Sequence, residues 1–154
     1  MTEIHLAALE TQPAAVVTVI RQFDERAGWY DGGCLSCAHW LSWRTGLDPG
    51  AAREKVRVAR ALARLPLISA AMQRGELSYS KVRALSRIAT PENESRLVGV
   101  ARGGTTAHVE RVVRAWRRAD RLEEARETAR RHQQRSLHTW VDEDGMLVIR
   151  GRGQ

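Results

Sequence analysis

Residues 40–85 alternate helix-forming runs with glycine and proline stops: WLSWRTGLDPGAAREKVRVARALARLPLISAAMQRGELSYSKVRAL. Gly46 is suited to end one helix, because glycine adopts the left-handed backbone found at helix C-termini. Asp48 and Pro49 then predict the start of the next helix. An Asp side chain caps free backbone N–H groups, and a proline at the first helical position gives up no hydrogen bond. The stretch therefore predicts a helix-turn-helix-like unit over residues 38–65.

The second helix of this unit, residues 49–65, carries four arginines at spacings of four, three and four residues. These are Arg53, Arg57, Arg60 and Arg64. At about 100° per residue they fall within an arc of roughly 60°, and the alanines, valines and leucines of the helix gather on another side. We call these four residues the arginine ridge. Glu54 is expected to point away from it, which would leave the ridge almost without acidic partners.

Many DNA-binding proteins insert a basic helix of such a unit into a groove of the duplex. The arginine ridge therefore predicts contact with duplex DNA. Arg53 and Arg57 are expected nearest the bases, because residues near the start of such a helix contact base edges. Arg60 and Arg64 are expected nearer the phosphates. The alternative interpretation is a solvated face with no partner.

Helix caps and the helical period predict further helices on both sides of this unit. After Ser136 the period changes to two, and Asp144-Gly145 is a strong signal for a β-hairpin within residues 137–150. The predicted fold is mainly α, with a helical domain at 1–135 and the hairpin region at 136–154. The other expected helices are 3–27, 34–45, 66–74, 79–89, 106–134 and one that starts at Thr90-Pro91-Glu92 and ends at Gly103-Gly104.

Length and charge limit the classes of function. The chain has 154 residues and a formal net charge of +7, which favours a polyanionic partner over an acidic small molecule. No run approaches the roughly 18 apolar residues of a membrane span, and no signal-peptide pattern opens the chain. We therefore expect a cytoplasmic protein with no small-molecule substrate and no membrane contact. The sequence is compatible with a homo-oligomer.

Cys34 and Cys37 form a single C-x-x-C pair. A structural zinc site needs four ligands, and no second pair or histidine cluster at suitable spacing accompanies this one. We interpret the cysteines as two small apolar residues at the inner side of a helix start, and we expect no metal and no cofactor.

Several segments resemble one family in order along the chain: GWYDGG, WLSWRTGL, AREKVRVARALARLP, GELSYSKVRAL and WVDEDGMLVIRG. By these segments the chain resembles the domain of unknown function 222. The resemblance implies a helical N-terminal part, which in members of that family is followed by an HNH endonuclease motif. More distantly, the run from Gly46 through Leu65-Pro66 to GELSYSKVRAL resembles the helix-turn-helix domain of ParB-type partition proteins. That likeness implies a supporting helix at 38–45 and a recognition helix at 49–64.

We expect no catalysis by this chain. An HNH nuclease binds its metal through histidines and an asparagine, with one histidine as general base. The single asparagine is Asn93, and no histidine-rich helix follows His138. Family members continue after the hairpin, so the chain looks cut short. We expect a non-catalytic DNA-targeting module. The alternatives are a protein–protein interaction module that uses helix 106–134 and the hairpin edge, or a remnant without function.

Overall fold

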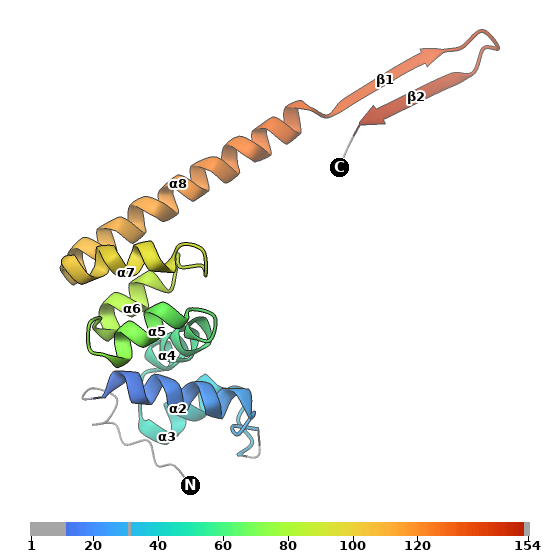
Figure 1. Ribbon diagram of the computed structural model, residues 1–154. Coiled ribbons are helices and arrows are strands. Elements are labelled where there is room, and N and C mark those ends of the chain that lie inside the picture. The colour runs from blue at the N-terminus through green and yellow to red at the C-terminus, as the bar shows by residue number, and fades with distance from the viewer. Residues whose placement is uncertain (1–11, 31, 153–154) are drawn as a thin grey trace. The chain divides into compact units, whose positions relative to one another are not determined.

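The computed structural model describes residues 12–30 and 32–152, and these form seven helices and one two-stranded sheet (Figure 1). The prediction of a mainly α fold is confirmed. The chain divides into two compact units, Met1–Val113 and Arg114–Gln154. The sequence-based division at residue 135 stays a prediction, and the expected helical residues 3–11 lie outside the described part.

Six helices and the start of a seventh make up the first unit. They are α2 (Pro13–Glu25), α3 (Cys37–Thr45), α4 (Pro49–Leu62), α5 (Pro66–Gln73), α6 (Tyr79–Leu85), α7 (Glu94–Gly103) and the beginning of α8 (Thr106–Gln133). The predicted start of α4 is confirmed, since the Asp48 carboxylate accepts the N–H groups of Gly50 at 2.7 Å and Ala51 at 3.1 Å. Gly46, with φ of 72°, ends α3 as expected.

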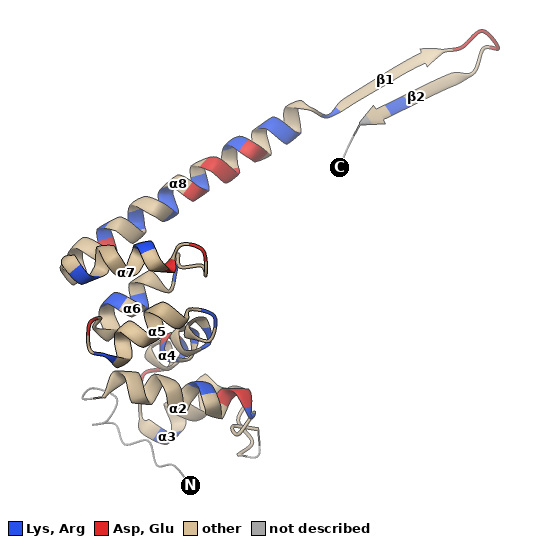
Figure 2. Ribbon diagram, in the orientation of Figure 1, with Lys and Arg blue, Asp and Glu red and all other residues tan. Residues whose placement is uncertain are grey.

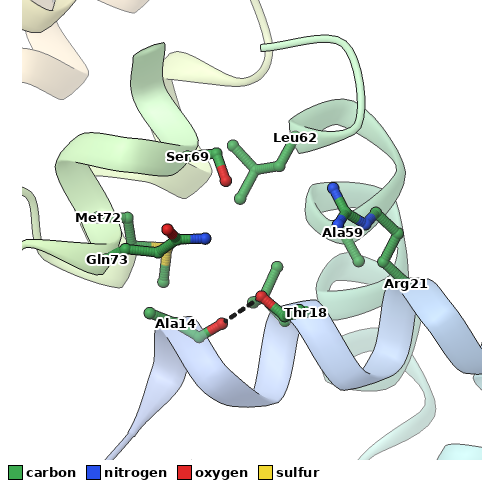
Figure 3. A pocket seen from close by; sticks show the side chains of 9 residues that line it. Ala14, Thr18, Arg21, Ala59, Leu62, Ser69, Met72 and Gln73 are labelled. Carbon is green, nitrogen blue, oxygen red and sulfur yellow. Dashed lines mark hydrogen bonds between the residues drawn. The ribbon is translucent and has the colours of Figure 1, made fainter. Parts of the chain in front are cut away.

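Helix α4 packs against both α2 and α3, and its apolar side is fully buried there. Ala52, Val58 and Ala59 are each 0% exposed. Between α2, α4 and α5 the packing leaves a cavity of only about 10 Å³, beside which the Thr18 hydroxyl donates to the Ala14 carbonyl at 3.0 Å (Figure 3). A cavity of that size holds at most one water molecule, so the interior offers no ligand site there.

Several helix boundaries differ from the prediction. Helix α4 ends at Leu62 instead of residue 65, so Arg64 lies in the turn just after the helix. Helix α3 starts at Cys37 instead of residue 34, because the Ser36 side chain caps it by accepting the His39 N–H. Helix α6 ends at Leu85 instead of residue 89. The Thr90-Pro91-Glu92 start is wrong, since the Asn93 side chain accepts the Thr90 N–H at 2.7 Å and donates to the Ile88 carbonyl at 3.0 Å, which stabilises a turn ahead of α7.

A buried carboxylate joins two helices of the first unit. Glu94, at the start of α7, is 3% exposed and accepts the N–H groups of Leu67 at 3.0 Å and Ile68 at 3.2 Å. These groups are among the free donors at the start of α5, and a carboxylate there is also favoured by the helix dipole. Glu94 therefore has a structural role.

The second unit contains the rest of α8 and a hairpin of β1 (Ser136–Val141) and β2 (Leu147–Arg152). The hairpin is confirmed. Its turn is a three-residue loop, because the Gly145 N–H donates to the Asp142 carbonyl and the Asp142 N–H donates to the Met146 carbonyl. Gly145 takes the left-handed position with φ of 80°, which explains why a glycine follows Asp144.

Candidate nucleic-acid interface

The arginine ridge lines one surface groove of about 540 Å³ beside α4. Three segments that are distant in sequence form its walls: α4 itself, Ser36 and Ala38 at the start of α3, and Ser86 just after α6. We call this feature the arginine groove. The helical spacing thus does bring the four side chains together around a single concavity, although the structure gives them different surroundings.

Arg57 is held against the protein. Its guanidinium donates to the Glu54 carboxylate through Nε and Nη2, both at 3.0 Å. It also donates to the carbonyls of Arg83 at 3.0 Å and Ser86 at 3.3 Å, and to the Ser86 hydroxyl at 3.1 Å. A cation that satisfies carbonyls at a helix C-terminus is favourable, so Arg57 ties α4 to the end of α6.

The expectation that Glu54 points away from the ridge is wrong. Residues three apart on a helix are surface neighbours, and Glu54 and Arg57 form such a pair. Glu54 also accepts a hydrogen bond from Arg87 at 2.7 Å. The hydrogen bond from Arg57 is the main cause that lowers the pKa of Glu54, with Arg87 adding to it, so the carboxylate is charged at neutral pH.

Arg60 also has an acidic partner. Its Nε and Nη2 donate to the Asp24 carboxylate of α2 at 2.6 and 2.9 Å. The Asp24 side chain is only 12% exposed, whereas Arg60 is 62% exposed and borders the groove. The hydrogen bond to Asp24 raises the pKa of Arg60. Arg60 therefore links α4 to α2 and still presents an edge of its guanidinium to solvent.

Arg53 and Arg64 are the two exposed members of the ridge that have no hydrogen bond or ion pair within the described part of the chain. They are eleven residues apart in sequence, with Arg53 on α4 and Arg64 in the turn just after it. Both border the groove. These two guanidinium groups are the ones available to an outside ligand.

The local charge balance is strongly positive. The ridge and Arg87 supply five guanidinium groups, and Glu54 and Asp24 are the carboxylates paired with them. Positive charge therefore remains in excess at the groove. Acidic residues also stand among the basic residues of α8 (Figure 2). A concave surface with an excess of guanidinium groups favours an anionic ligand, and phosphate oxygens suit the fork geometry of arginine.

The cysteines lie away from solvent. Both thiols are free and buried, and burial, with a smaller effect of the Asp24 charge, raises the pKa of Cys37 to about 11. A thiol held in the neutral form is a poor nucleophile and a poor metal ligand. Across residues 12–30 and 32–152, no group of three or more His, Cys, Asp or Glu side chains is placed to hold a metal ion.

A family model describes the chain from residue 2 to residue 152: Domain of unknown function (DUF222). The chain belongs to this family. The DUF222 match covers all the helices and both strands described above. The comparison with curated proteins found no match, and the comparison with solved structures found none either. The family description states no activity or ligand, so the case for a function depends on the arginine groove.

In the described part of this DUF222 chain, none of the helices combines the length and the apolar composition that a membrane crossing requires.

Proposed function

We propose that this DUF222 chain is a non-catalytic DNA-binding module and that its arginine groove receives the backbone of duplex DNA. The observation that supports this most strongly is the convergence of four arginines on one open groove, two of them without a partner in the part of the chain that the structure describes. Phosphate contacts supply most of the affinity of such proteins for DNA, and arginine is well suited to make them.

The contacts divide the ridge into two roles. Arg53 and Arg64 contact phosphates, since their guanidinium groups have no competing acceptor in the described structure. Arg57 and Arg60 fix the position of α4 against α6 and α2, and they add to the positive potential of the groove. This changes the roles expected for Arg53 and Arg60 and, most of all, for Arg57. To reach a base edge it would have to give up its bonds to Glu54 and to the end of α6.

The order of elements also supports the proposal. Helix α3, a three-residue connection through Gly46, and α4 follow one another as the supporting and recognition helices do in helix-turn-helix proteins. In this proposal the module targets an HNH endonuclease-like protein to DNA, a role that stems from the family resemblance. Asn93, the single asparagine, stabilises a turn, so we propose no cleavage by these residues.

The test is the affinity for random-sequence duplex DNA across a salt series. Each neutralised phosphate contributes about −0.9 to the slope of log K against log salt. We expect Arg53→Ala and Arg64→Ala each to make the slope less negative by about 0.9. Arg96→Ala, an exposed arginine on α7, serves as the control and should leave the slope unchanged. A slope that is the same in all four proteins would contradict the proposal.

A second candidate function is protein binding through the hairpin. Leu137, Val141, Leu147 and Ile149 are each more than 60% exposed, and two-stranded hairpins are marginal in water unless they pack on something. Self-association through these side chains would appear in sedimentation as a mass above that of one chain. Leu147→Ser with Ile149→Ser should then return the protein to a monomer. A monomeric parent at high concentration would exclude self-association.

A further inference from the structure

The two faces of the hairpin differ in chemistry. Strand residues alternate between faces, and directly paired residues share one. The register pairs Leu137 with Gly151, Thr139 with Ile149 and Val141 with Leu147, so one face is almost entirely apolar. The register also pairs His138 with Arg150 and Trp140 with Val148. The second face therefore combines an aromatic ring with basic side chains, and we call it the basic face.

Trp140 lies at the end of the basic face nearest the turn, since its pair with Val148 is the last one on that face. Its side chain is 45% exposed, and it stands opposite Val148, which is half-buried although its neighbours along β2 are exposed. A large aromatic side chain paired with a β-branched one is a stabilising cross-strand contact, which holds the indole over the sheet. We therefore expect one side of the ring system to rest on the hairpin, and the exposed part of the side chain to be open to a ligand.

Two basic residues lie beside this ring, on the side away from the turn. Arg150 is the diagonal neighbour of Trp140 on the same face, and diagonal neighbours are about 7–8 Å apart, within reach of a long side chain. His138 stands beside both residues and is exposed, as Arg150 is. The basic face carries no acidic residue, and the acidic residues of the hairpin gather in its turn (Figure 2).

From this arrangement we propose that the basic face of the hairpin binds single-stranded nucleic acid, with one unpaired base stacked on Trp140 and an adjacent phosphate on Arg150. Aromatic side chains beside cations are the usual means of holding single strands, because every base has a π face and every nucleotide carries a phosphate. A paired base within a duplex has its faces covered by its neighbours, so only an unpaired base can stack on Trp140 in this way.

This contact goes beyond the proposed function, since it uses other residues, in the other unit of the chain, and another form of nucleic acid. The experiment measures fluorescence anisotropy of labelled 15-nucleotide dT and rU strands with the full chain. Trp140→Ala should weaken binding by about 5- to 150-fold, as loss of one stacked base does. Trp140→Phe should retain most of the affinity. Arg150→Ala should make the salt slope less negative by about 0.7.

The matched control is Thr139→Ala, next to Trp140 in sequence but on the apolar face. It should bind both strands as the parent does. Equal losses of affinity in Thr139→Ala and Trp140→Ala would overturn the inference, because they would show that binding does not depend on the basic face. Unchanged binding in Trp140→Ala would also overturn it.

Duplex binding by Arg53→Ala with Arg64→Ala separates the two proposals. If that variant loses duplex binding and Trp140→Ala binds single strands normally, the hairpin inference alone fails. If Trp140→Ala loses single-strand binding and the arginine variant binds duplex normally, the groove proposal alone fails.

Discussion

Replacing Arg57 with alanine should destabilise the fold, although Arg57 lies on a ridge that also contains freely exposed arginines. The substitution removes the bonds to Glu54 and to the carbonyls that end α6. Hydrogen bonds to charged groups contribute roughly 1.5–3 kcal/mol each when they are well shielded. Here the Arg57 side chain is 34% exposed and Glu54 keeps Arg87 as a partner, so solvent reduces the sum. We expect a total loss of about 2 kcal/mol.

Urea unfolding followed by circular dichroism measures this loss, with Arg53→Ala as the matched control. Arg53 is exposed on the same helix and has no partner in the described structure, so its replacement should change the free energy of unfolding by no more than about 0.5 kcal/mol. For a chain of this size, a loss of 2 kcal/mol in Arg57→Ala corresponds to a decrease in Tm of about 4–8 °C.

Equal stabilities for Arg57→Ala and Arg53→Ala would refute this reasoning. They would mean that the bonds between α4 and the end of α6 contribute nothing measurable, and that Arg57 is as available to DNA as Arg53.

Three further predictions concern the same region. Arg60→Ala should lower the free energy of unfolding, measured with urea, by about 1–3 kcal/mol, because it leaves the mostly buried Asp24 carboxylate without its cation. Adding Asp24→Asn to this variant should restore part of the lost stability. Because the pKa of Glu54 is lowered in the folded chain, this carboxylate stabilises the fold fully above the ordinary pKa of 4.5, and its contribution is lost as the pH falls below that value. Glu54→Gln should therefore show a smaller decrease of Tm than the parent when the pH is lowered below 4.5. An unchanged dependence of Tm on pH would contradict this. Cys34→Ser leaves Cys37 as the single thiol, and its pKa near 11 keeps it protonated at pH 8. It should therefore react with Ellman's reagent far more slowly in the folded chain than in guanidinium chloride. Equal rates would show that the thiol is accessible and ionised.

The sequence predicted the parts of the structure that depend on local chemistry. The start of α4 follows from Asp48 and Pro49, and the grouping of Arg53, Arg57 and Arg60 follows from the helical period. The Glu54–Arg57 pair could also have been found, because a separation of three residues places two side chains about 60° apart on a helix.

The partners of the ridge from other helices could not be found in this way. Asp24 is 36 residues from Arg60, and the carbonyls that Arg57 reaches lie 26 and 29 residues from it. Whether such groups meet depends on how α2 and α6 pack on α4, which the period of a single helix does not specify. The same limit explains the early end of α6, where the Asn93 side chain stabilises a turn in place of the Thr90 cap.

The most direct test of the arginine groove compares two double variants that lose the same charge. Arg53→Ala with Arg64→Ala removes the unpartnered guanidinium groups of the groove, and Arg96→Ala with Arg118→Ala removes two exposed arginines elsewhere in the chain. The measurement is the Kd for a random-sequence duplex at physiological salt. We expect a loss of affinity of about tenfold or more per arginine in the groove variant, as for charge-assisted hydrogen bonds, and binding close to that of the parent in the other variant. Equal losses in the two variants, or parental binding by the groove variant, would contradict the proposal.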